Sequence, residues 1–500
     1  MADESGLNPF VFACEGGLVL DQSTFAMQPG MALELQNFEP DIRGGYRRIS
    51  GYAKWNSNIV PQTASATEPV LMSAHFNNKV IAARGTKVYE AGTTGSWSQI
   101  DTGRTSAGKY SHFRYNLAGT DFIVWADGAN HASKYDGTTV TDLNASGAPA
   151  DPKFVVGHKD KLFFAGMSST PQQITFTAPF TDNDFQTSNG AGTVKVDSNV
   201  TGLFPFRESL FIFCEERIFK LTGNTAADFV LQPVTREIGC VNGFTIKEVA
   251  GDIIFLGPDG LRTVAGTEKI GDVELGTISR PVQRRFQAVS DVDEFESVVV
   301  PDKTQYRIFF SNSATSRPNT TGLIAVRKEN YEFSDLRGIR PSCTDSVVNA
   351  GESIVLHGEF DGYVYRQEQG NDFDGNIITG KYRSPDLTMG DAGIRKNFQR
   401  VIINYAPEST VSADLFVRYD YEAPNVPRPA AYPFDTATSV AVYGSSVYGT
   451  ATYGGQSNPL VRQPIEGSGF AVALRVNDRG TSAPYSLKGF QLEFDAGARR

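Results

Sequence analysis

Residues 209–223 read SLFIFCEERIFKLTG, and this stretch decides the fold class of the chain. Four apolar residues at 210–213 lead into a short polar turn at 214–216, and a second strand-forming run follows at 217–221. Apolar and aromatic runs on either side of a tight polar turn are typical of a β-hairpin. The stretch therefore predicts two neighbouring antiparallel strands.

The same hairpin pattern recurs along the chain with different residues. Asp-Gly, one of the strongest short turn signals, begins at positions 127, 136, 259 and 361. Successive copies lie roughly 35 to 65 residues apart, which overlaps the spacing of β-propeller blades. We expect an irregular β-propeller of six or seven blades over residues 61–375. The further copies of the pattern lie at residues 79–90, 121–137, 161–166, 252–264 and 353–367.

Residues 1–60 do not have the pattern of a blade. Short strand-like runs at 17–20 and 31–35 are separated by a Pro-Gly break, and a basic, glycine-rich stretch follows at 43–48. Terminal segments of this kind are ordered when another part of the structure ties them down. We expect an extended N-terminal arm that packs on the C-terminal domain or on a neighbouring subunit.

The pattern of apolar and polar residues changes near residue 376. The apolar runs become longer and alternate with polar residues, which favours strands with one buried face. Long alternating strands with a closing terminal strand predict a β-sandwich-like domain over residues 376–500. The alternating runs lie at residues 400–406, 413–423, 470–478 and 486–495.

Composition limits the classes of protein to which the chain can belong. Its 500 residues exceed a single ordinary core, so two or more domains are expected. Hydrophobic residues make up 40%, with 34 Phe and 49 Gly, as in a folded β-rich protein. The net charge of −10 is opposite to the basic surface by which proteins usually grip DNA phosphates. The sequence therefore favours a surface that does not hold nucleic acid.

Four scattered cysteines predict neither a disulfide framework nor a zinc site. Cys214 and Cys240 lie in apolar strand contexts, so we expect them to be small buried hydrophobic residues. The start, MADESGLNPF, lacks the basic region of a signal peptide, and no apolar run approaches a membrane span. We expect a protein that folds in the cytosol.

The sequence shows no pattern that predicts catalysis, a metal or a cofactor. The five histidines lack metal-ligand spacing, and neither a nucleophile elbow nor a phosphate-binding loop is present. The acidic group Asp291, Asp293, Glu294 and Glu296 suits either a carboxylate site or a solvated turn, and the solvated turn is favoured. Residues 372–376, DFDGN, resemble the start of a calcium loop but lack its downstream Glu.

The order of parts resembles a known family. In the arm, residues 37–52 contain an Asn-x-x-Pro motif, an Arg- and Gly-rich run and a Gly-Tyr motif. The C-terminal part carries a Tyr-Gly repeat at Tyr443, Tyr448 and Tyr453, and its last predicted strand reads LKGFQLEF. In this layout the chain resembles the tail nozzle or hub proteins of short-tailed bacteriophages, also called packaged-DNA stabilisation or tail tubular B proteins.

The resemblance implies a structural protein of the virion tail, assembled in the host cytoplasm. It implies a homohexameric ring below the portal and the head-to-tail adaptor protein, with tail fibre or distal needle proteins as further partners. Genomic DNA would pass through the channel without sequence-specific binding, and the acidic charge suits a wall along which DNA slides. The alternative is a carbohydrate-binding or capsule-degrading propeller of the tail.

A closed ring needs heterologous contacts between identical subunits. Aromatic and arginine side chains are favoured at the cores of such interfaces. We therefore expect contacts with a neighbouring subunit or the adaptor at Arg43, Arg47, Arg48, Tyr443, Tyr448 and Tyr453.

Overall fold

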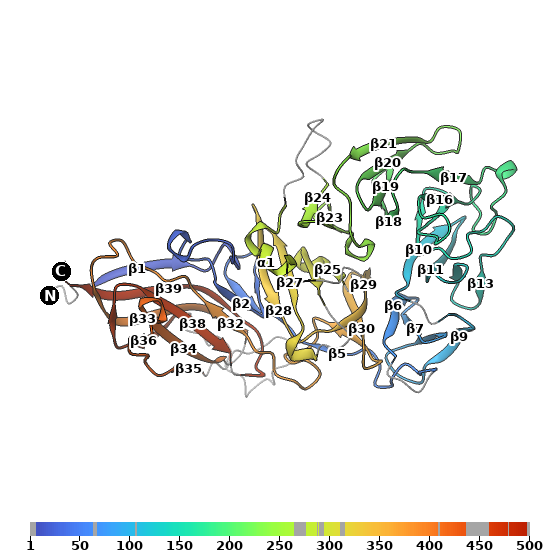
Figure 1. Cartoon of the computed structure of the whole chain (residues 1–500). Coiled ribbons are helices and arrows are strands. Elements are labelled where there is room, and N and C mark those ends of the chain that lie inside the picture. The colour runs from blue at the N-terminus through green and yellow to red at the C-terminus, as the bar shows by residue number, and fades with distance from the viewer. Residues whose placement is uncertain are drawn as a thin grey trace.

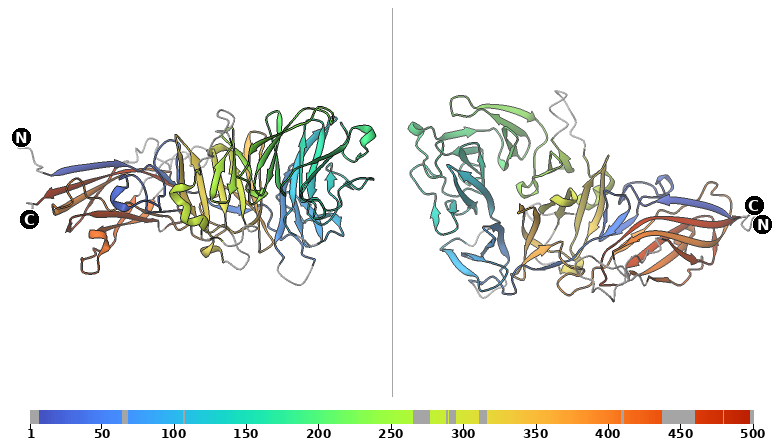
Figure 2. Two further views of the ribbon diagram at one scale, coloured as in Figure 1. Left: turned by 45° about the horizontal axis from the view of Figure 1, so that its top comes forward. Right: turned by 180° about the vertical axis from the view of Figure 1, so that it is seen from behind.

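The computed structural model of the chain has two parts side by side, a β-propeller and a C-terminal sheet domain (Figure 1). Views from other directions show the same elongated body, with both termini at the end far from the propeller (Figure 2). The predicted all-β class with a propeller, a sandwich-like domain and an extended arm is confirmed. The structure describes residues 7–63, 68–105, 108–264, 277–287, 289, 295–310, 316–408, 411–436, 460–478 and 480–497.

Four consecutive four-stranded sheets make up the first half of the propeller. Each is an antiparallel meander, because every strand pairs with the one that follows it in the chain. Their strands are β6 (Val70–Phe76), β7 (Lys79–Arg84), β8 (Lys87–Ala91) and β9 (Ser98–Thr102); β10 (Ser111–Leu117), β11 (Thr120–Ala126), β12 (Ser133–Tyr135) and β13 (Val140–Asp142); β14 (Phe154–His158), β15 (Lys161–Ala165), β16 (Gln173–Phe176) and β17 (Gly192–Lys195); and β18 (Val200–Phe206), β19 (Ser209–Cys214), β20 (Ile218–Thr222) and β21 (Val230–Thr235).

The second half of the propeller is less regular. It contains a three-stranded sheet, the first four strands of a nine-stranded sheet, and a four-stranded sheet that includes a strand from the arm. Six sheets thus belong to the propeller alone, and β25 to β28 occupy a further blade position. The strands are β22 (Lys247–Val249), β23 (Asp252–Gly257) and β24 (Gly260–Thr263); β25 (Glu296–Val300), β26 (Gln305–Phe309), β27 (Gly322–Arg327) and β28 (Tyr331–Leu336); and β29 (Pro341–Asn349), β30 (Glu352–Glu359), β31 (Val364–Gln367) and β5 (Tyr52–Lys54).

The hairpin predicted from SLFIFCEERIFKLTG is formed by β19 and β20. Leu210 lies opposite Leu221, and Phe213 lies opposite Ile218. All six residues of β19 are buried, because the strand lies inside its blade and neighbouring blades cover both of its faces. This double burial explains why the run is continuously apolar and does not alternate.

The last blade takes its outer strand from the N-terminal segment. Residues 52–54, which the sequence analysis assigned to the arm, pair as β5 with β31, Gln367 lying opposite Tyr52. The chain reaches this position through a narrow gap at Gly51, where a side-chain Cβ would lie 1.8 Å from the carbonyl oxygen of Asp372. A glycine is required there because the two backbones nearly touch.

One short arm strand joins the propeller to the C-terminal domain. β2 (Glu34–Gln36) pairs in parallel with β28, Gln36 lying opposite Asp335, and antiparallel with β32, Leu35 lying opposite Tyr382. A propeller blade therefore continues by backbone hydrogen bonds into the C-terminal domain as a nine-stranded sheet. Its remaining strands are β32 (Lys381–Arg383), β38 (Val472–Asp478), β34 (Val411–Tyr419) and β35 (Tyr432–Thr436).

A second sheet packs against this one and completes the sandwich. Its strand β39 pairs with arm strands β1 and β4 along one edge and with β33 along the other. Apolar residues of both sheets share a single core, in which Tyr382 stacks on Phe490 at 5.6 Å. The strands are β1 (Asn8–Ala13), β3 (Phe38–Pro40), β4 (Tyr46–Arg48), β33 (Lys396–Pro407), β36 (Leu460–Pro464), β37 (Ser468–Gly469) and β39 (Tyr485–Ala496).

Within the described ranges, helical structure is confined to short turns. Residues 280–287 form a 3-10 turn followed by α1 (Gln283–Gln287). In the described part of the chain, no helix is long and apolar enough to cross a bilayer. The 3-10 turns are η1 (Thr24–Ala26), η2 (Thr187–Asn189), η3 (Gly243–Thr245), η5 (Arg280–Val282), η7 (Pro301–Lys303), η8 (Arg317–Asn319) and η9 (Asp420–Glu422).

A buried ion pair fixes the arm where the two parts meet. The side chain of Arg48 is 1% exposed, and its Nε lies 3.2 Å from the Asp478 carboxylate of β38. The guanidinium also donates to the carbonyls of Gly480 and Ser482 and to that of Asn371, which follows the last blade. Burial lowers the pKa of Arg48 and raises the pKa of Asp478, so each charge depends on the other.

Replacing Arg48 tests this junction. Arg48→Met leaves Asp478 as a buried carboxylate without its cation, so we expect the free energy of unfolding to fall by about 3 to 5 kcal/mol in urea denaturation. Arg43→Met is the matched control, because Arg43 is 81% exposed and we expect a change within about 0.5 kcal/mol. Equal effects of the two substitutions would contradict the proposed role of Arg48.

Candidate functional site: the central cavity of the propeller

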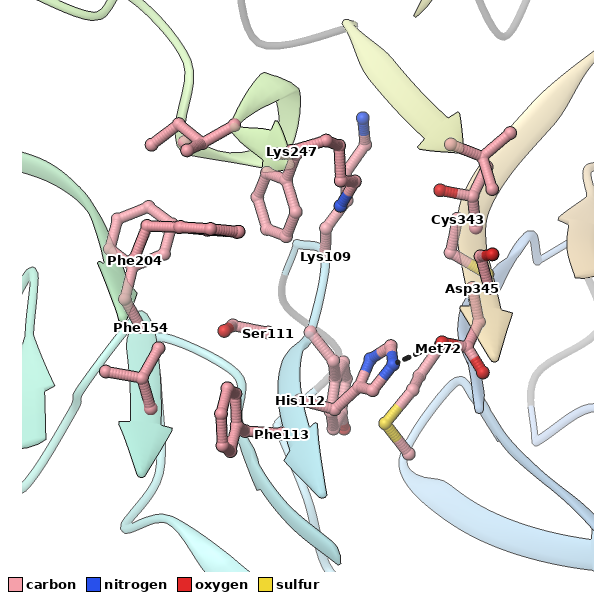
Figure 3. Close-up of a pocket in the computed structure, with 18 of the residues that line it drawn as sticks. Met72, Lys109, Ser111, His112, Phe113, Phe154, Phe204, Lys247, Cys343 and Asp345 are labelled. Atoms are coloured by element: carbon pink, nitrogen blue, oxygen red, sulfur yellow. Dashed lines mark hydrogen bonds and ion pairs between the residues drawn. The ribbon is translucent and has the colours of Figure 1, made fainter. Parts of the chain in front are cut away.

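The first strands of the blades surround a cavity on the propeller axis (Figure 3). Its volume is about 460 Å³, and residues of β6, β10, β14, β18, β22, β25 and β29 line it. Pockets of 300 to 1,000 Å³ with a few placed polar groups are typical of small-molecule sites. The propeller therefore builds its candidate binding site where all of its blades converge.

Asp345, on β29, is the best-connected acid of the cavity. Its carboxylate pairs with Arg114 and lies 3.2 Å from His112 Nε2, both on β10 (Figure 3). It also accepts the backbone N–H of His75 at 2.8 Å. Burial raises the pKa of Asp345, but Arg114 and His112 outweigh burial and hold the pKa well below its usual range. This carboxylate is therefore charged, and its charge is balanced within the protein.

Glu296, on β25, forms a second buried pair in the wall of the cavity. Its Oε2 lies 3.2 Å from Lys109 Nζ, and its Oε1 accepts the Thr344 hydroxyl at 2.8 Å. The Lys109 ammonium also donates to the Phe295 carbonyl at 2.8 Å. The sequence analysis favoured a solvated role for the acidic group to which Glu296 belongs. That interpretation is wrong for Glu296, which is 3% exposed, and the other three acids lie outside the described residues.

Lys247, on β22, is the cation of the cavity without a close acid. Its ammonium has no hydrogen bond or ion pair with any described residue, although Glu296 and Asp345 are near enough to influence its pKa. Burial lowers the pKa of Lys247, which means that the folded chain disfavours this charge. Glu248, the next residue of β22, is exposed and also borders the cavity.

The opposite wall of the cavity is aromatic. Phe113, Phe154 and Phe204 come from β10, β14 and β18, and Phe244 comes from η3 (Figure 3). The rings of Phe154 and Phe244 lie 5.9 Å apart, and Lys109 Nζ lies 5.6 Å from the centre of the Phe244 ring. The cavity therefore has one charged wall and one apolar wall.

Most of the charged groups of the cavity are paired with one another. Both buried acids are engaged by cations, Glu296 by Lys109 and Asp345 by Arg114. Burial raises the pKa of the Cys343 thiol to about 12, which suppresses the reactive thiolate. Across the described ranges, no three His, Cys, Asp or Glu side chains gather closely enough to hold a metal ion. All four cysteines are buried and free, as expected for Cys214 and Cys240.

The three predicted contact residues that the structure describes, Arg43, Arg47 and Arg48, lie in the arm and do not line this cavity. Arg43 is exposed and pairs only with Asp41. Arg47 is partly buried, with Nε 2.6 Å from Glu408 and Nη1 3.1 Å from Glu39. Arg48 is buried at the junction, so its guanidinium serves this chain and is not presented to a neighbour. Tyr443, Tyr448 and Tyr453 lie outside the described residues.

Sequence reasoning did not identify the residues of the cavity. Lys109, Lys247 and Asp345 are isolated charges in unrelated strands, and only the closure of the ring brings them together. The one sequence signal that could have indicated the cavity is a charged residue within the first strand of a blade, as in residues 247–249, KEV. His112 is a partly buried partner of Asp345.

Comparisons with known proteins yield distant likenesses in fold. No protein-family model and no curated protein matches the sequence. Similar solved structures include an ancestral GH74 enzyme (TM-score 0.41, 9% identity, 65% of this chain and 49% of that chain). Others are a chain of the Mitotic Checkpoint Complex (0.39, 12%, 62% and 93%) and the AfRom2 CNH domain (0.38, 11%, 64% and 99%). The alignment spans about half of the GH74 enzyme, and likenesses of this strength carry no argument about activity.

The Asp345 cluster gives a test of the electrostatics of the cavity. Asp345→Asn leaves Arg114 without its counter-ion, so we expect the free energy of unfolding to fall by about 3 kcal/mol at neutral pH. Because the pKa of Asp345 is lower in the folded chain, its contribution is complete above the unfolded pKa of about 3.9 and is lost as pH falls below that value. Urea denaturation of both proteins from pH 7 to pH 3 measures this difference. A difference that grows on acidification would contradict the assignment.

Proposed function

We propose that this protein is a structural component of the tail of a short-tailed bacteriophage, a subunit of the nozzle ring below the portal and adaptor. In this role the ring encloses the DNA exit channel, retains the packaged genome and releases it on infection. The proposal starts from the resemblance carried by residues 37–52, the Tyr-Gly repeat and the final strand.

The observation that carries the proposal is the continuous nine-stranded sheet. A tail component must transmit force between its neighbours without a hinge between its own parts. Here blade strands β25 to β28 continue through β2 into β32, β38, β34 and β35, so that backbone hydrogen bonds join the two parts. Relative motion of domains is the ordinary expectation when an interface is small and polar, and a shared sheet removes that freedom.

The charge of the chain supports the same role. A conduit for DNA must hold phosphates weakly, and the net charge of −10 per subunit is multiplied around a ring. The predicted contact residues also have suitable positions in the chain. Arg43 is exposed at the β3–β4 turn. The Tyr-Gly repeat falls in the sequence between β35 and β36, and among the described residues each of these strands is the edge strand of its sheet.

Assembly tests the proposed function directly. We expect the purified chain to form a closed ring of about six copies, alone or once the adaptor protein is added, as measured by light scattering and negative-stain imaging. The ring should not retain double-stranded DNA at physiological salt. A chain that stays monomeric with the adaptor, or that binds DNA tightly at physiological salt, would overturn the proposal.

The interface prediction has its own test. We expect Arg43→Ala combined with Tyr443→Ala, Tyr448→Ala and Tyr453→Ala to weaken ring assembly at least tenfold in protein concentration, because aromatic and arginine side chains dominate interfaces. Lys195→Ala, on the outer strand of a blade, is the matched surface control. Assembly at an unchanged concentration in the combined variant would remove these residues from the interface.

A further inference from the structure

Two of the three cations that line the central cavity have a buried acid as partner. The cations are Lys109, Arg114 and Lys247; the buried acids are Glu296 and Asp345, and the exposed Glu248 also borders the cavity. Glu296 is engaged by Lys109, and Asp345 is engaged by Arg114. Lys247 is therefore the cation without a partner of its own within the described part of the cavity.

An uncompensated cation in a partly desolvated wall is costly for the fold. Burial without a paired acid disfavours the charged form, and the pKa of Lys247 is lowered accordingly. A methionine at this position would fill similar space without that cost. Side chains that oppose stability in this way are characteristic of functional sites. Lys247 is thus poised to gain stability from an anion that enters the cavity.

The remaining lining restricts what that anion can be. Among the described residues of the cavity, Lys247 is the cation without an ion pair, which matches a single negative charge, and the carboxylates of Glu296 and Asp345 repel a molecule that carries several. The wall of Phe113, Phe154, Phe204 and Phe244 offers apolar surface for the body of the ligand. A volume of about 460 Å³ admits a single ring with its substituent and excludes a nucleic-acid strand of any length.

We propose that the central cavity binds a small organic monocarboxylate, with the carboxylate on Lys247 and a ring against the phenylalanine wall. Lys109 also borders the cavity but stays paired with Glu296. Its positive charge therefore attracts the ligand carboxylate from a distance, and Lys247 makes the direct contact. The inference goes beyond a role in the tail ring, because it concerns one subunit and requires no assembly.

Two pairs of small molecules, each an acid and a neutral compound of similar shape, test the proposal on the full-length chain. The probes are benzoate with benzamide as its neutral counterpart, and D-glucuronate with D-glucose. We expect at least one acid to bind about tenfold or more tightly than its neutral counterpart in isothermal titration calorimetry at pH 7, because a charge-assisted contact is worth at least that factor. If neither acid is preferred, the proposal is overturned.

Substitution at Lys247 locates the binding. Lys247→Met should abolish the preference for the acid and leave the thermal unfolding midpoint unchanged or raised, since it removes an unpaired charge. Lys247→Gln serves the same purpose if the first variant does not fold. Lys195→Met, on an exposed position of β17, should bind as the wild type does. Retention of the acid preference in a folded Lys247 variant would overturn the assignment. Because the cavity lies within one subunit, the acid preference is expected with or without ring formation, and its loss would leave the proposed tail function untouched.

Discussion

The architecture depends on a few backbone hydrogen bonds made by the N-terminal arm. The arm enters through β1 on the outer sheet, passes as β2 between the propeller and the sandwich, and ends as β5 in the last blade. Each contact is short, but together they close the propeller and attach it to the sandwich. Arg48 adds a buried ion pair between the arm and β38. Any other position of the arm would leave the Asp478 carboxylate buried without its cation, which is costly. The main apolar core also continues from blade residues such as Ile308 and Phe333 into the sandwich, so side-chain packing and the arm strands together join the two parts.

The same closure creates the central cavity. Each blade contributes its first strand to the axis, and most of the charged residues on those strands meet partners from other blades: Asp345 of β29 meets Arg114 of β10, and Lys109 pairs with Glu296 of β25. These pairs hold nonadjacent blades together at the axis, where apolar packing is interrupted by the cavity. Lys247 departs from this arrangement, because its ammonium pairs with no residue that the structure describes, and this is the feature that most suggests a ligand.

The fold was predictable from the sequence because its signals are local. Each hairpin has its own apolar runs and turn residues, and the alternating runs at residues 400–406 and 486–495 lie within β33 and β39. The role of β5 was not predictable, because its three residues carry no blade pattern and their partner strand lies more than 300 positions away. Arg48 was expected on the surface, since arginine is rarely buried, and only its pairing with the distant Asp478 explains its position. The cavity was missed for the same reason, as its residues converge only when the ring closes.

The central claim is that the arm makes the propeller and the sandwich one rigid body, and a distance distribution tests it most directly. Spin labels at Lys195, on an outer propeller strand, and at Asn397, on β33 of the sandwich, report the separation of the two parts by double electron–electron resonance. Both side chains are exposed, and the four native cysteines are buried, so labelling is selective. The structure predicts one narrow distribution that does not change with temperature below unfolding. A broad or two-peaked distribution would show that the parts move independently and would contradict the account.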